Sequence, residues 1–112
     1  MGGFMVFPSR MKFQLGTMVI TPAVLRSHSV DEICRAIDRH VCGEWGDVSD
    51  VARAANETAL LSGGRLLSVS HPRGLALRVL TTGDRLTTTV HLSGERLPFA
   101  DTRTDTKTIK TD

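Results

Sequence analysis

The stretch that decides the fold is residues 29–64, SVDEICRAIDRHVCGEWGDVSDVARAANETALLSGG. Ser29 and Glu32 have the spacing of a capping box, in which each side chain accepts a hydrogen bond from the backbone of the other residue. Apolar residues then recur at helical spacing as far as Val41, and Gly43 is a typical residue at which to end a helix. The stretch therefore begins with an amphipathic helix.

A second helix is predicted after the corner formed by residues 43–47. Asp47 is a suitable N-cap, and Gly63-Gly64 provides a stop. Between them a stripe of small apolar residues recurs at helical spacing: Val48, Val51, Ala52, Ala55 and Ala59. The alanines predict a close approach to another element.

Alternating apolar and polar residues predict strands on both sides of these helices. One strand begins near Phe13, before the helix start at Thr21-Pro22. Three more follow around residues 67–69, 75–79 and 86–92, joined by short turns at 71–74 and 82–84. The prediction is an α+β fold of order β-α-α-β-β-β, with two helices packed on one face of a small antiparallel sheet that the first strand joins.

The length of 112 residues supports one small domain. We predict a flexible leader over residues 1–11, a single domain over 12–92 and a polar, disordered tail over 93–112. Neither a signal peptide nor a membrane span is indicated, so a cytoplasmic protein is expected. Cys34 and Cys42 are predicted to be reduced, buried thiols rather than a disulfide or a zinc site.

Charge is distributed unevenly along the chain, although the net charge is only +2. Residues 31–57 hold seven acidic residues and three arginines, whereas residues 65–91 hold four arginines and one aspartate. The acidic helix offers a partner-binding surface that could mimic phosphate. The arginines of the meander offer an alternative surface for anions or nucleic acid: Arg65, Arg73, Arg78 and Arg85. Ordinary surface solubility is the third interpretation of the same pattern.

Trp45 is the single tryptophan of the chain and lies between two glycines. One interpretation places its indole in the core, with Gly43 and Gly46 permitting a tight corner. The other places it at an interface, where tryptophan is enriched among energetically important residues. Together with the acidic residues, it completes the predicted partner-binding set: Trp45, Glu44, Asp31, Glu32 and Asp38.

No catalytic motif occurs, and neither a metal site nor a cofactor site is predicted. His71 and His91 fall at or in neighbouring predicted strands, which makes a small hydrolase a third class of function. His40 lies in the last turn of the first helix, where a protonated imidazole would suit the helix dipole. For His40 we predict a structural role.

Several short motifs resemble a family of small uncharacterised proteins from plasmids, phages and integrated mobile elements. That family shows "LG..V.TP", "H..GDWG", "G.RLLS" and "ITE.DRS.T". The corresponding residues here span about 13–92 and include an asparagine in the second helix: Leu15-Gly16, Thr21-Pro22, His40, Gly43–Asp47, Asn56, Gly64–Ser68 and Leu80–Thr88. Glu44 and Thr82 depart from the family pattern, which has aspartate and glutamate at these places.

The resemblance implies an accessory protein of a mobile element. Some members are labelled a type I restriction methylation subunit, but this chain lacks the length and the glycine-rich loop of a methyltransferase. We therefore predict a non-enzymatic binding protein, with counter-defence as its purpose: it would block a CRISPR or restriction complex by occupying a site. The alternative is a nucleic-acid-binding accessory or regulatory factor. The oligomeric state is left open, a homodimer included.

Overall fold

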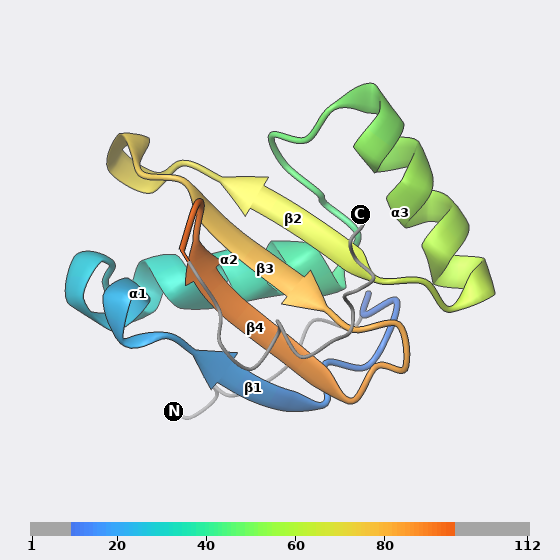
Figure 1. The fold of residues 1–112 in the computed structure, drawn as a ribbon, viewed down its shortest axis with the longest axis horizontal. Coiled ribbons are helices and arrows are strands. Elements are labelled where there is room, and N and C mark those ends of the chain that lie inside the picture. Colours follow the sequence, from blue (N-terminus) through green and yellow to red (C-terminus); the bar gives the residue numbers. More distant parts are fainter. Residues whose placement is uncertain (1–9, 96–112) are drawn as a thin grey trace.

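The computed structural model describes residues 10–95 and confirms the α+β class (Figure 1). Three helices and a four-stranded sheet make up the fold. In chain order these are β1 (Thr17–Ile20), α1 (Pro22–Ser27), α2 (Val30–Val41), α3 (Asp50–Ser62), β2 (Leu66–Ser70), a 3-10 turn (Pro72–Gly74), β3 (Leu77–Thr81) and β4 (Thr87–Leu92).

The sheet has the strand order β1-β4-β3-β2. The meander of β2, β3 and β4 is antiparallel, as predicted. The prediction of a wholly antiparallel sheet is wrong, because β1 joins β4 in parallel, with Thr17 opposite Thr87 and Ile20 opposite Val90. A short turn would force an antiparallel pair, but the chain between β1 and β4 contains three helices and two strands. A connection of that length can return to the starting end of β1.

Helix α2 covers one face of the sheet, where it contacts β2 and β3, and α1 lies beside it against β4 (Figure 1). The start of α2 confirms the capping box: Glu32 N–H donates to Ser29 Oγ at 3.1 Å, and Ser29 N–H donates to Glu32 Oε1 at 3.0 Å. Ile33, Ala36 and His40 of the helix meet the core face of the sheet, whereas Val41 packs with Leu15 and Cys42.

Helix α3 lies along the edge of the sheet beside β2 and not on its face (Figure 1), so the prediction of two long helices on one face is wrong. Ser49, not Asp47, caps the helix, and its hydroxyl accepts from Ala52 N–H. Asn56 and Ala59 are buried, whereas Val51 is 80% exposed. The inward side of the helix thus carries the polar Asn56 beside Ala59, because it meets a strand edge whose backbone groups need hydrogen-bond partners.

The outer edge of β2 is covered by the corner and by α3. Val69 N–H donates to the carbonyl of Trp45 at 3.0 Å, and Asp47 N–H donates to the carbonyl of Val69 at 2.8 Å. Nearly two turns into α3, the amide of Asn56 donates to the carbonyl of Leu67 at 2.8 Å and accepts from Leu67 N–H at 3.1 Å. An edge whose N–H and C=O groups are satisfied in this way does not invite another strand.

Two further predictions, one about the cysteines and one about the end of the domain, need revision. Cys34 is exposed on α2 and only Cys42 is buried, so the prediction of two buried thiols is half wrong. The described fold also continues past residue 92, because Glu95 accepts hydrogen bonds from Thr21 Oγ1 at 2.9 Å and Leu92 N–H at 3.0 Å. Residues 1–9 and 96–112, and with them most of the predicted leader and tail, lie outside the described residues.

None of the described helices is long and apolar enough to cross a membrane.

Candidate functional site

His40 is fully buried at the end of α2 and has hydrogen-bond partners on both ring nitrogens. Nδ1 meets Ser68 Oγ, and Nε2 lies 2.8 Å from Thr81 Oγ1. Burial lowers the pKa of this imidazole to about 3, helped by the charge of Arg85. The ring is therefore neutral at pH 7, so the predicted protonated imidazole is wrong, and the burial and the two hydrogen-bond partners agree with a structural role.

The hydroxyls beyond His40 determine which ring nitrogen holds the proton. Thr88 Oγ1 lies 2.7 Å from the carbonyl of Leu15, to which it can only donate. Thr81 Oγ1 must then donate to Thr88 Oγ1, 2.7 Å away, and in turn accept from Nε2–H of His40. Ser68 consequently donates to Nδ1. Every donor in this hydrogen-bonded network is used once, so the network ties the end of α2 to β2, β3 and β4.

Acid should destabilise the fold through His40. The unfolded chain takes up a proton near the ordinary pKa of 6.5, whereas the folded chain does not until about pH 3. The free energy of unfolding should therefore fall as the pH drops below 6.5, by up to about 1.4 kcal/mol per unit for this group. Urea denaturation of the wild type and of His40→Gln at pH 7, 6 and 5 checks this. In the variant, the contribution of His40 to the slope of the unfolding free energy against pH should be absent. The smaller contribution of His91, whose pKa burial also lowers, should remain. Identical slopes would contradict the assignment.

Trp45 belongs to the core, with 1% of its surface exposed. Its ring stacks on Phe13 at a centroid distance of 6.4 Å and meets His40 edge-on at 5.8 Å. The indole N–H donates to Glu57 Oε2 at 2.7 Å. A side chain so deeply buried offers nothing to a partner, so its inclusion among partner-binding residues is wrong and the core interpretation holds.

The acidic residues of the predicted partner surface are mostly paired. Asp31 binds Arg35 one turn later at 2.6 Å, and Glu44 lies 3.4 Å from Arg10. Glu32 accepts two hydrogen bonds from Arg73, which lower its pKa to about 2 together with the backbone N–H of Ser29. Asp38 is the member of the set with no ion pair among the described residues. Paired carboxylates present little net negative charge, so the surface is a weak mimic of phosphate.

The four arginines of the meander do not converge on one face. Arg85 donates to the carbonyls of Ala59 at 2.8 Å and Gly64 at 2.7 Å, where it satisfies the end of α3. Arg73 binds Glu32 and, at 2.6 Å, the carbonyl of Ser27. The prediction that these two take part in an anion-binding face is therefore wrong, because both serve the fold.

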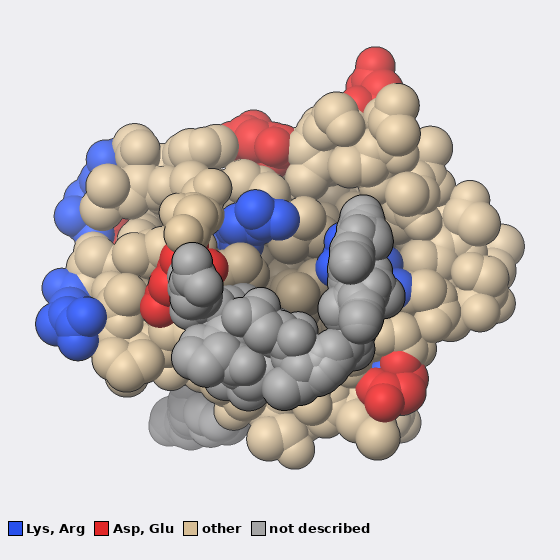
Figure 2. Space-filling model, viewed as in Figure 1, with Lys and Arg blue, Asp and Glu red and all other residues tan. Residues whose placement is uncertain are grey.

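Arg78 confirms the expectation that it points away from the core, since Leu77 and Val79 on either side are buried. It is half-buried on the face opposite α2. Burial lowers the pKa of its guanidinium, and the positive charge of Arg65 lowers it further. Among the described residues, the Lys and Arg side chains visible on this side of the molecule lie in separate places (Figure 2). Arg65 and Arg78 remain as the nucleic-acid candidates.

His71 lies at the end of β2, where its Nδ1 is 2.8 Å from Asp47 Oδ2. Asp47 thus pairs with a histidine instead of capping α3. His91 is buried on the face opposite α2, and burial lowers its pKa. Within residues 10–95 no group of three or more histidine, cysteine or acidic side chains could hold a metal ion.

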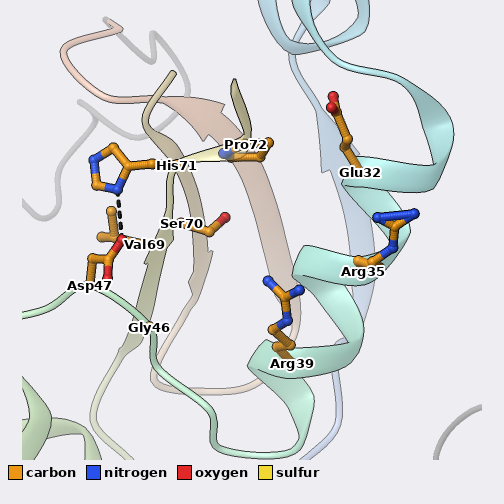
Figure 3. Close-up of a pocket in the computed structure, with 9 residues that line it drawn as sticks. All are labelled: Glu32, Arg35, Arg39, Gly46, Asp47, Val69, Ser70, His71 and Pro72. Carbon is orange, nitrogen blue, oxygen red and sulfur yellow. Dashed lines mark hydrogen bonds and ion pairs between the residues drawn. The ribbon is translucent and has the colours of Figure 1, made fainter. Parts of the chain in front are cut away.

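A cleft of about 430 Å³ opens between α2 and the end of β2 (Figure 3). Ser70 points from the strand toward α2, and the guanidinium of Arg39 points back from α2 toward the strand, while His71 turns away toward Asp47. We call this cavity the α2–β2 cleft. Its lining comes from α2, the corner and the end of β2: Glu32, Arg35, Arg39, Gly46, Asp47, Val69, Ser70, His71 and Pro72.

The charged side chains around the α2–β2 cleft have partners, with one exception. Glu32 and Arg35 each form an ion pair, and Asp47 and His71 are hydrogen-bonded to each other. Arg39 has neither an ion pair nor a side-chain hydrogen bond to any described residue. Sequence analysis did not single out Arg35 or Arg39. Their i,i+4 spacing on one face of a helix was the available signal, because it places two guanidinium groups side by side.

Comparison with known proteins adds no relative to this description: no family model, no curated protein and no solved structure matches the chain.

Proposed function

We propose that this chain is a non-enzymatic binding protein that contacts its partner through the α2–β2 cleft. The observation that carries the proposal is the free guanidinium of Arg39 in a cavity whose other charged residues are paired. An unpaired cation in a concave site is a strong recognition element, since its charge is available to an incoming group. Asp38 and the Asp31–Arg35 pair, exposed on the same helix, extend the surface around the cleft.

The resemblance to mobile-element proteins suggests the biological setting. In that setting the partner is a protein complex of a bacterial defence system, such as a CRISPR or restriction complex, and binding blocks one of its sites in the cytoplasm. A rigid domain with a structural histidine network and no catalytic motif suits a blocker, because inhibition by occupancy needs only affinity and shape.

Charge reversal in the cleft tests the proposal. The tagged full chain is used to capture partners from its bacterial host, with and without nuclease, and mass spectrometry quantifies them. A stoichiometric protein complex should survive nuclease treatment, and Arg39→Glu should reduce its recovery about tenfold or more, because a favourable charge contact becomes a repulsive one. Arg26→Glu is the matched control, since Arg26 is exposed on α1 and does not line the cleft. Undiminished capture by Arg39→Glu would contradict the proposal.

Nucleic acid is the second candidate partner, and one feature of the sheet favours it. The positive charges of Arg65 and Arg78 lie close together on the face opposite α2, where Arg65 lowers the pKa of the Arg78 guanidinium, and the Nε atom of Arg78 has no hydrogen-bond partner among the described residues. In this case nuclease would remove the captured material, and the affinity for single-stranded DNA or RNA would fall steeply with salt. Arg78→Gln should then reduce the slope of log K against log salt by about one phosphate contact.

A further inference from the structure

The α2–β2 cleft continues inward into a second, smaller cavity. This inner chamber has a volume of about 30 Å³ and shares Arg39, Gly46, Val69 and Ser70 with the outer cleft. Its far wall is formed by Ala36 of α2 and by Leu77 and Val79 of β3, all buried in the core. The cavity is thus polar at its mouth and apolar at its base.

The mouth has the donors that a carboxylate requires. A guanidinium presents N–H groups in a planar fork, which matches the two oxygens of a carboxylate. Arg39 has this fork free, and the hydroxyl of Ser70, directed toward α2, has no hydrogen bond to a described residue (Figure 3). Glu44 also lines the inner chamber, but it is held by Arg10 at 3.4 Å.

The base of the cavity selects for an apolar group. A volume of about 30 Å³ is enough for one or two water-sized groups. Water there would find few partners, because the walls contributed by Ala36, Leu77 and Val79 are hydrocarbon and Ser68 already donates its proton to His40. A methyl or isopropyl group loses nothing by entering such a space and gains the free energy of leaving water.

We propose that the cleft binds a carboxylate that carries a short branched or unbranched aliphatic group, with the carboxylate on Arg39 and Ser70 and the aliphatic group in the inner chamber. This deepens the proposed function, on which it rests, by naming the chemistry of the contact. Two sources supply this chemistry: a free short-chain acid, and the C-terminal residue of a polypeptide that ends in a small apolar side chain.

Titration of the isotope-labelled full chain, followed by the backbone NMR signals of Gly46, Val69 and Ser70, tests the proposal. The probes are acetate, isobutyrate and isobutyramide. Isobutyrate should bind about fifteenfold more tightly than acetate, because it buries two more carbon groups and each contributes about a fourfold gain. Isobutyramide should give no saturable shift, since it lacks the charge that Arg39 recognises.

Variants separate the two halves of the cavity. Arg39→Gln should weaken isobutyrate about tenfold or more, and Arg26→Gln should leave its affinity unchanged. Ala36→Val, which adds two methyl groups at the wall of the inner chamber, should remove the advantage of isobutyrate over acetate. The proposal would be overturned if isobutyrate and isobutyramide shifted the NMR signals equally, or if Arg39→Gln left the affinity for isobutyrate unchanged. Signal dispersion shows in each case that the variant is folded.

Two acetylated tripeptides ending in valine, one a free acid and one amidated, distinguish the sources. Tighter binding of the free-acid peptide than of isobutyrate indicates a polypeptide C-terminus, and weaker binding indicates a free acid. If none of the carboxylates shows saturable binding to the wild-type protein, this inference is wrong, but the proposed function is not thereby contradicted. The capture experiment with Arg39→Glu tests the proposed function separately, because it needs no assumption about which chemical group enters the cleft.

Discussion

Gly46→Ala is expected to lower the free energy of unfolding by about 3 kcal/mol, measured by urea denaturation. Gly46 has φ +75°, and a Cβ at this position would lie 2.2 Å from the carbonyl oxygen of Val69. A left-handed alanine costs about 1–2 kcal/mol. Relief of the clash must in addition move the corner away from β2, which breaks the hydrogen bond from Asp47 N–H to the same carbonyl, at a cost of about 1–3 kcal/mol.

Gly74→Ala is the matched control for this prediction. Gly74 has φ +81°, but no heavy atom lies within 4 Å of the position its Cβ would take. The control therefore contains the backbone penalty alone and should cost about 1–2 kcal/mol. The difference between the two variants measures the close approach of the corner to β2. Equal losses would show that the corner does not hold the strand edge.

Trp45→Ala is expected to cost about 3–5 kcal/mol of stability, which is a large share of the total for a domain of this size. The indole fills the space between Phe13, Ala59 and Leu66, where its removal leaves a cavity. Circular dichroism during thermal unfolding should show a much lower midpoint or no cooperative transition.

Trp45→Phe is the control, because it retains an aromatic ring and loses only part of the indole volume together with the bond to Glu57. It should cost clearly less than the alanine variant, since Glu57 is exposed and can bind water instead. The core interpretation would be contradicted if Trp45→Ala kept wild-type stability and lost only its partner. That result would restore the interface interpretation of the tryptophan.

The features predicted correctly from the sequence depend on neighbours along the chain. The capping box of Ser29 and Glu32, the helix stop at Gly63 and the turns of the meander each involve residues a few positions apart. The direction of β1 and the position of α3 depend instead on segments far apart in the sequence. Polarity patterns show which residues are apolar, but they do not show whether a helix will meet a sheet face or a strand edge.

The candidate site was harder to predict for the same reason. Arg73 and Glu32 are 41 positions apart, and Arg85 binds a carbonyl at a helix end 26 positions away. The partners of these charges therefore could not be identified from neighbouring residues in the sequence. A side chain becomes available for binding only when folding gives it no partner. Arg39 is such a side chain, and no local pattern distinguishes it from Arg35, which has Asp31 one turn before it.

The buried network of His40 has a consequence for strand alignment. Leu77, Val79 and Thr81 of β3 face the core, as do Thr88, Val90 and Leu92 of β4. A slip of two residues between these strands would leave all six on the same face, so hydrophobic burial alone scarcely opposes it. The slip would separate Thr81 from Thr88, interrupt the hydroxyl chain and leave buried polar groups without partners, which is costly. The histidine and its hydroxyls thus specify the register of the sheet: they favour the observed pairing of β3 with β4 over pairings shifted by two residues.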